Sequence, residues 1–129
     1  MARELLGRYS AHTYAVLRII SGLMFAMHGS QKLFGLPGDG TTVPLATRYG
    51  VAGVIELVCG LMIAAGFRTS YAAFLASGQM AFAYFLGHAG RGLLPTLNQG
   101  ELAVLYCFLF LYMASSGSGI WSVDGGKRR

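Results

Sequence analysis

The chain has 129 residues, of which 54% are hydrophobic and only 12% are charged, and its net charge is +5. A soluble domain carries about 25% charged residues, so these charges are too few to cover a globular surface, and we expect lipid to cover much of it. The length suits a single domain, residues 1–129. The basic residues form no stripe on one element, which argues against nucleic acid as a partner.

Apolar runs follow one another along the chain and predict four helices, at residues 13–34, 49–67, 71–89 and 101–116. The first run is long enough to cross a bilayer, whose core needs about 20 residues, and it is too long for a cleaved signal peptide. Arg68, Thr69 and Ser70 make a very short connection, so the second and third helices should be antiparallel neighbours. The predicted class is all-α, a membrane-embedded four-helix bundle. A soluble helical bundle is the alternative, and it would need polar helix faces.

Loop charges predict the topology. Four spans place both termini on one side of the membrane. Six basic residues would lie on that side: Arg3, Arg8, Arg68, Lys127, Arg128 and Arg129. Three would lie on the other side: Lys32, Arg48 and Arg91. Because basic loops stay in the cytoplasm, the prediction is N-in and C-in.

The first helix carries an inward stripe. At about 100° per residue, one third of its circumference holds all its ionisable residues and two glycines. The members are Arg18, Gly22, Phe25, His28, Gly29 and Lys32. Charged side chains avoid lipid and glycines allow close helix approach, so this stripe should face the other helices. Arg18 is a structural polar residue, expected to snorkel or to cap an adjacent helix.

Two helices place ionisable residues at matching depth. His28 is about 9 Å and Glu56 about 10 Å from the outer ends of their helices, at about 1.5 Å per residue. An unpaired carboxylate there would be expensive. Lys32 is within reach of Glu56, and His28 is level with it. Gly53 and Gly60 add a small-residue face around the acid.

Further polar residues lie on the same side of the bundle. His88 ends the third helix, with Tyr84 on its face, and Glu101 begins the fourth helix. Asn98 and Glu101 have the spacing of a capping box, which gives Asn98 a structural role. Gln79 is about 180° from His88 on the helical wheel, so we expect it to make a contact elsewhere.

Several kinds of site are disfavoured. The sequence has no HxxH, HExxH or cysteine cluster, so no metal site is predicted. His28 and His88 differ in depth by about 7 Å, so no haem is predicted between them. Cys59 and Cys107 are expected to be small buried hydrophobes. The aromatic residues Tyr84, Tyr106, Tyr112 and Trp121 are expected in the core or at the membrane interface rather than against a cofactor.

The first-helix stripe, followed by Leu33, Phe34 and Gly35, resembles the signature of the DoxX family, as does Gly53-x-x-Glu56-x-x-x-Gly60. The resemblance covers essentially the whole chain. It implies a small four-helix protein of the bacterial or archaeal cytoplasmic membrane. It also implies an association with quinone-linked oxidation, for example as a thiosulfate:quinone oxidoreductase subunit, or with membrane oxidoreductase complexes that counter oxidative stress.

The leading hypothesis is a redox-associated membrane subunit that holds a quinone near its outer face, with other membrane or redox subunits as partners. The candidate binding residues are His28, Lys32, Glu56, Tyr84, His88 and Glu101. Histidine and lysine can donate to quinone carbonyls, and a carboxylate can relay protons. The alternative is a non-catalytic assembly or scaffold subunit in which the charges only hold the bundle together. A transporter is a third reading, which would require a homo-oligomer.

Overall fold

The computed structural model describes residues 4–125, and every regular element in that range is helical, which confirms the all-α class. The long helices are α1 (Ser10–Phe34), α2 (Arg48–Ala65), α3 (Thr69–Gly87) and α5 (Glu101–Ser116). The short ones are η1 (Gly7–Tyr9), η2 (Ala89–Arg91) and α4 (Pro95–Asn98). The expected ranges agree with the long helices except at their ends, and α4 lies where only a loop was expected.

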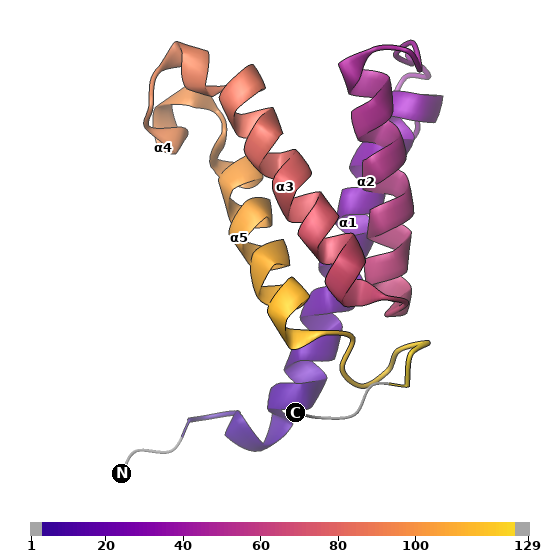
Figure 1. Cartoon of the computed structure of the whole chain (residues 1–129), viewed down its shortest axis with the longest axis vertical. Helices are drawn as coiled ribbons and strands as arrows, with labels where there is room; N and C mark the ends of the chain where they lie inside the picture. The colour runs from indigo at the N-terminus through magenta and orange to yellow at the C-terminus, as the bar shows by residue number, and fades with distance from the viewer. Residues whose placement is uncertain (1–3, 126–129) are drawn as a thin grey trace.

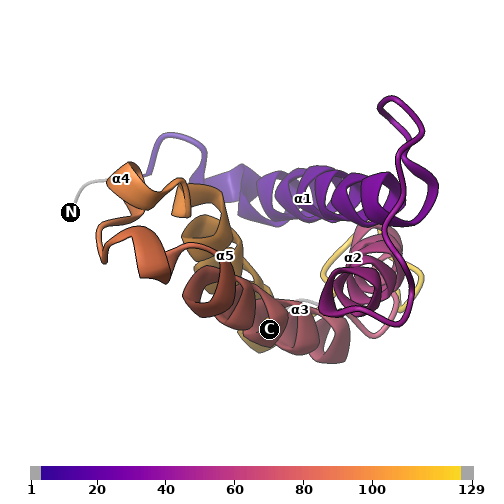
Figure 2. The same cartoon turned by 90° about the horizontal axis from the view of Figure 1, so that it is seen from above.

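The long helices form two pairs, α1 with α2 and α3 with α5, and α3 also contacts α2. In Figure 1 the pairs converge where α2 turns into α3 and diverge in the other direction. Seen from above in Figure 2, α1 and α3 lie on opposite sides of the bundle, with α2 and α5 between them. We call the convergent end, with residues 66–68 and 117–125, the closed end. The divergent end, with residues 35–47 and 89–98, is the open end.

Glycines hold α1 and α2 together. A Cβ on Gly22 would lie 2.5 Å from the backbone nitrogen of Ala64, and one on Gly60 would lie 2.5 Å from that of Ala26. A Cβ on Gly29 would meet the backbone of Gly53 and Leu57. These contacts leave no room for any side chain, so the two helix backbones touch along the stripe that the sequence predicts.

The second pair packs differently. Small residues of α3 (Ala72, Ala73, Ala76) face large residues of α5 (Tyr106, Phe110, Met113) in the main apolar core. The Ser77 hydroxyl donates to the Cys107 carbonyl at 2.7 Å and ties the two helices together. Phe25 of α1 reaches this core, with ring centroids 5.3 Å from Tyr106 and 4.8 Å from Phe110. Phe25 therefore joins the two pairs through aromatic contacts, in addition to the contact of α3 with α2.

Arg18 joins α1 to α2 and to the C-terminal segment at the closed end. Its side chain is fully buried and donates to the carbonyls at the end of α2, Ile63 at 2.9 Å and Ala64 at 3.4 Å. It also donates to carbonyls of the C-terminal segment: Ser118 at 2.6 Å, Ile120 at 3.0 Å and Trp121 at 2.6 Å. The prediction that it caps an adjacent helix is confirmed. The alternative, snorkelling, is wrong, because residues 117–121 fold back over the guanidinium and shield it from solvent.

The predicted capping box at the start of α5 is also wrong. The N-cap residue is Gly100, and no side chain caps the helix. Asn98 instead ends α4, and its Oδ1 accepts from the backbone N–H of Gly100 at 2.9 Å. The turn at Gln99, with φ 62°, separates Asn98 from the helix that it was expected to cap.

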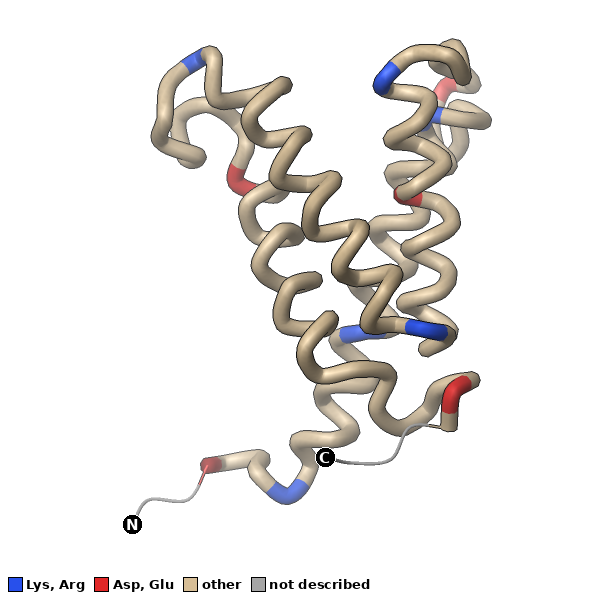
Figure 3. The backbone as a smooth tube through the Cα atoms, in the orientation of Figure 1, with Lys and Arg blue, Asp and Glu red and all other residues tan. Residues whose placement is uncertain are grey.

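The outer surface of the helices is strongly apolar. Exposed large side chains include Ile20, Val58, Phe82 and Phe108. By length and composition, α2 could cross a membrane, and α5 is apolar but shorter. Figure 3 shows Lys and Arg of the described part toward the two ends of the long helices. Four residues of the charge count, Arg3 and Lys127 to Arg129, lie outside the described residues.

Candidate functional site

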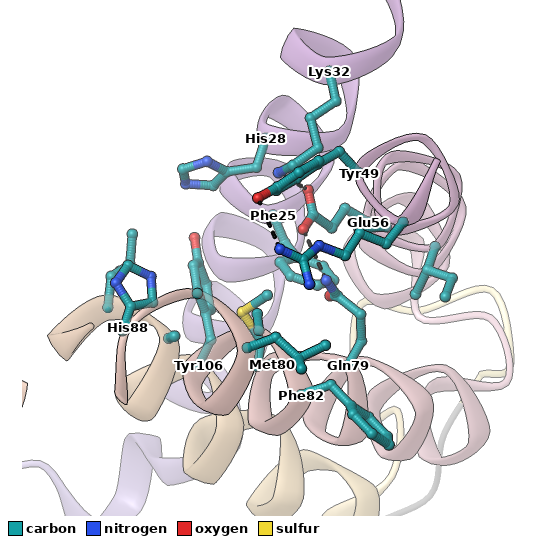
Figure 4. A pocket seen from close by; sticks show the side chains of 18 of the residues that line it. Phe25, His28, Lys32, Tyr49, Glu56, Gln79, Met80, Phe82, His88 and Tyr106 are labelled. Carbon is teal, nitrogen blue, oxygen red and sulfur yellow. Dashed lines mark hydrogen bonds and ion pairs between the residues drawn. The ribbon is translucent and has the colours of Figure 1, made fainter. Parts of the chain in front are cut away.

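A cavity of about 680 Å³ opens between the two helix pairs at the open end. Side chains of α1, α2, α3 and α5 line it, and Figure 4 shows several of them. Much of its wall is apolar, for example Phe25, Ile55, Met80 and Ala83. Its polar members include His28, Lys32, Glu56, Gln79, His88 and Tyr106. The cavity forms because the two helix pairs meet at Phe25 and separate from there toward the open end.

The predicted partner of Glu56 is confirmed. Lys32 Nζ lies 2.7 Å from Glu56 Oε1, and the Glu56 side chain is only 3% exposed, against 28% for Lys32. Gly53 allows this pairing, because a Cβ there would come 3.0 Å from Lys32 Cβ. A buried carboxylate needs such a partner, since an uncompensated charge in this position is strongly destabilising.

The loop after α1 holds Lys32 in place. Gly35 ends the helix in the left-handed conformation (φ 70°), and its N–H donates to the Gln31 carbonyl at 3.0 Å. The N–H of Val43 donates to the Lys32 carbonyl at 2.9 Å. Within the loop, the Thr41 N–H donates to the Asp39 carboxylate at 2.9 Å and lowers the pKa of that exposed group.

Gln79 belongs to this cluster, and as expected its contact is a different one from that of His88. Its Nε2 donates to Glu56 Oε2 at 3.1 Å. The helical-wheel angle was measured from His88, but α3 ends at Gly87 and His88 has a non-helical backbone (φ −127°). The wheel therefore does not describe where His88 lies relative to Gln79, and both residues line the cavity.

Tyr106 was expected in the core or at the membrane interface, and it lies in the core and lines the cavity as well. It is 4% exposed, and its ring lies edge-on to His28 with centroids 6.1 Å apart. In Figure 4 its hydroxyl points toward His28. Within residues 4–125, two buried side-chain atoms of the cavity have no hydrogen-bond partner, the Tyr106 hydroxyl and Gln79 Oε1. The sequence did carry one indication of this role, because Tyr106 places a hydroxyl on the inner face of a very apolar helix.

The remaining candidates divide between the cavity and the connection after α3. His88 lines the cavity, and its Nδ1 lies 3.1 Å from the Asn98 carbonyl. Tyr84 supports the connection instead. Its hydroxyl donates to the Leu93 carbonyl at 2.7 Å and accepts from the Asn98 amide at 3.0 Å. Asn98 is fully buried, as its structural role requires. Glu101 is exposed at the start of α5 and is not part of the cavity lining.

The arrangement suits a small, mainly apolar ligand with a few polar atoms. Ligand sites are typically concave, apolar and supplied with a few placed polar groups, at volumes of about 300–1,000 Å³. The cavity provides the Lys32–Glu56 ion pair, the Arg48 guanidinium, two amides, two phenols and two imidazoles, and the rest of its wall is apolar. In the described part of the chain, no three His, Cys, Asp or Glu side chains lie close enough to hold a metal ion.

Fold and site define an all-helical protein with a lipid-compatible surface and a polar cluster held between its helices. The family model of DoxX matches residues 13–89, which include Lys32, Glu56 and Gln79. The chain belongs to the DoxX family, which is a family of membrane proteins. An uncharacterized protein of Haemophilus influenzae is 42% identical over 128 residues, spanning 92% of this chain and 93% of the relative. No solved structure matches the chain.

Proposed function

We propose that this protein binds the head group of a quinone in the cavity at the open end, as a membrane subunit of a redox complex. The observation that carries the proposal is the pair of buried, unpartnered polar atoms on Tyr106 and Gln79 in a cavity with largely apolar walls. Buried polar atoms in folded proteins nearly always have partners. A flat apolar ring with polar substituents, such as a quinone head group in one of its redox forms, would supply them.

The side chains fit a quinone. The Tyr106 hydroxyl can donate to a ring carbonyl, and Lys32 has N–H donors beyond the one directed at Glu56. Phe25 and Met80 offer apolar contacts for the ring. The cavity is partly open, so a hydrophobic tail would have a way out toward the apolar outer surface.

A bound quinone would supply two-electron, two-proton chemistry. The chain's own contribution is to bind the ring, exclude water and hold protons nearby. His28 can carry a proton on its imidazole, and no residue of the described part hydrogen-bonds its ring nitrogens. The Glu56 side chain, which pairs with Lys32, is a carboxylate that can accept a proton. We assign the supply of electrons to a partner subunit.

In the same proposal the four long helices cross a bacterial or archaeal cytoplasmic membrane, with both termini in the cytoplasm. The support is the count of basic residues in the sequence, six on the side predicted for the two termini against three on the other side. The cavity would then face the outer half of the bilayer. A reporter that fluoresces only in the cytoplasm, fused to the C-terminus, should be bright, and a dark fusion contradicts this orientation.

Binding of a short-tailed quinone to the purified protein in lipid nanodiscs tests the proposal by calorimetry. We expect Tyr106→Phe, His28→Ala and Glu56→Gln each to weaken binding about tenfold, which is about 1.4 kcal/mol. The matched control is Tyr112→Phe, an exposed tyrosine of the same helix outside the cavity lining, which should bind normally. Thermal unfolding of each variant shows that it is folded.

A protein that binds no quinone, or three variants that bind as the wild type does, would remove the proposal. The scaffold alternative predicts a different outcome. There the double variant Lys32→Met, Glu56→Leu would fold and still co-purify with its membrane partners. Loss of partner activity with assembly intact would count against the scaffold and for a ligand site.

A further inference from the structure

The orientation of the Gln79 amide follows from its neighbour. Glu56 Oε1 accepts from Lys32 Nζ at 2.7 Å, and a carboxylate group paired with a lysine presents acceptor oxygens to its other neighbours. The end of Gln79 that lies 3.1 Å from Glu56 Oε2 must therefore be the NH₂ group. A flipped amide would place two acceptors against each other. Gln79 Oε1 consequently points away from Glu56.

The Gln79 carbonyl oxygen can only accept hydrogen bonds, and it lacks a donor within the described residues. Gln79 Oε1 is buried, and it has no partner in the described part of the chain. A carbonyl oxygen can be satisfied only by an O–H or N–H group. Tyr106 is less restrictive, because its hydroxyl can donate or accept. Of the two unpartnered groups, Gln79 therefore sets the requirement on a ligand.

This requirement separates the two redox forms of a quinone. The oxidised ring carries carbonyls, which are acceptors, so it leaves Gln79 Oε1 unsatisfied. The reduced ring carries hydroxyl groups, which can donate to Gln79 Oε1. A site built to hydrogen-bond a hydroxyl discriminates strongly against an analogue that lacks it, because its own polar group is then left unpaired.

We infer that the cavity binds the reduced, hydroxyl-bearing form of its quinone in preference to the oxidised form, and that Gln79 is the specificity-determining residue. The inference rests on the proposed quinone site and adds the redox state that the site selects. A tenfold preference for the reduced form raises the midpoint potential of the bound two-electron couple by about 30 mV. The site then favours reactions that deliver electrons to the quinone.

The test compares tetramethylhydroquinone with tetramethylbenzoquinone, bound without oxygen to the full protein in nanodiscs. We expect the wild type to bind the hydroquinone at least tenfold more tightly. Gln79→Met, which has a similar shape and no acceptor oxygen, should bring the two affinities to within about twofold while still binding the quinone, which shows that it is folded. Gln31→Met, on the exposed face of α1 outside the cavity, should keep the wild-type ratio.

The outcomes separate this inference from the proposed function. Binding of neither form to the wild type overturns both. Equal binding of the two forms overturns the redox preference and leaves the quinone site standing. A preference that survives in Gln79→Met overturns the role of Gln79.

Discussion

The two ends of the helix pairs each bury a charged side chain, and they treat it in opposite ways. At the closed end, the five hydrogen bonds of the Arg18 guanidinium within the described residues all go to backbone carbonyls. Two belong to Ile63 and Ala64, and three belong to residues 118–121. At the open end, Glu56 has two side-chain partners, Lys32 and Gln79. In the same cavity, Gln79 Oε1 and the Tyr106 hydroxyl have no hydrogen-bond partner among the described residues.

The two networks differ in whether all of their polar atoms have partners, and this difference distinguishes a structural network from a candidate binding site. A buried polar network that is fully satisfied rigidifies the fold, whereas an unsatisfied group costs free energy unless something else completes it. The Arg18 network is complete and joins the C-terminal segment to α2. The open-end network is incomplete within the described residues, and the cavity beside it has room for a ligand. Four substitutions test this comparison.

The largest effect is expected from Gly22→Leu, which tests the α1–α2 contact that both ends share. A Cβ at this position would lie 2.5 Å from the Ala64 nitrogen and 2.7 Å from the Gly60 carbonyl oxygen, so the helices cannot close. We expect a loss above about 4 kcal/mol, in the range that unfolds small proteins. Size-exclusion chromatography and thermal unfolding in detergent measure it.

Gly78→Leu is the matched control for this substitution. Gly78 is exposed in the middle of α3, and nothing lies within 4 Å of its added Cβ. The control should unfold near the wild-type temperature. Equal unfolding of the two variants would show that α1 and α2 do not pack backbone to backbone.

Arg18→Met breaks the closed end. It leaves several carbonyls without a donor, and each unsatisfied buried acceptor costs about 1–3 kcal/mol, so we expect a loss of about 3 kcal/mol or more. Chemical unfolding in detergent gives this value. Arg8→Met, at an exposed arginine that hydrogen-bonds to the adjacent Tyr9, should change stability by less than about 0.5 kcal/mol. A loss as small in Arg18→Met would contradict a structural network.

Lys32→Met breaks the open end by leaving Glu56 buried with only the Gln79 amide. We expect a loss of about 3 kcal/mol, the size found when one member of a buried ion pair is removed. Adding Glu56→Leu should recover most of it, because replacement of both partners by apolar groups is nearly neutral. A double-mutant cycle on unfolding free energies measures the coupling, and additive losses would show that the pair contributes little.

The smallest stability effect, and one of opposite sign, is expected from Tyr106→Phe. Removing an unsatisfied buried hydroxyl should leave the unfolding free energy unchanged or raise it by up to about 1 kcal/mol, while quinone binding weakens. Thermal unfolding and calorimetry on the same sample measure both. Tyr112→Phe, at an exposed tyrosine, should change neither. A clear loss of stability in Tyr106→Phe would mean that its hydroxyl has a structural partner.

Part of the fold and of the cavity lining could be predicted from the local pattern of the sequence. The helices, the inward stripe of α1 and the pairing of Lys32 with Glu56 all follow from helical spacing and from the cost of leaving a charge in lipid. The family resemblance also came from these residues. Each of these inferences depends on positions within one helix or on depth along it, which the residue order determines directly.

Only the tertiary structure decided the remainder. The acceptors of Arg18 are backbone carbonyls, which every residue carries and no sequence pattern marks. Gln79 and Tyr106 come together with Glu56 and His28 in one cavity because α3 and α5 tilt away from α1 and α2 at the open end. The aromatic contacts of Phe25 and the bonds of Arg18 to the C-terminal segment hold the two pairs together toward the closed end. The residue order determined which side chains would turn inward, and the angle between the pairs decided which of them would be left without a partner.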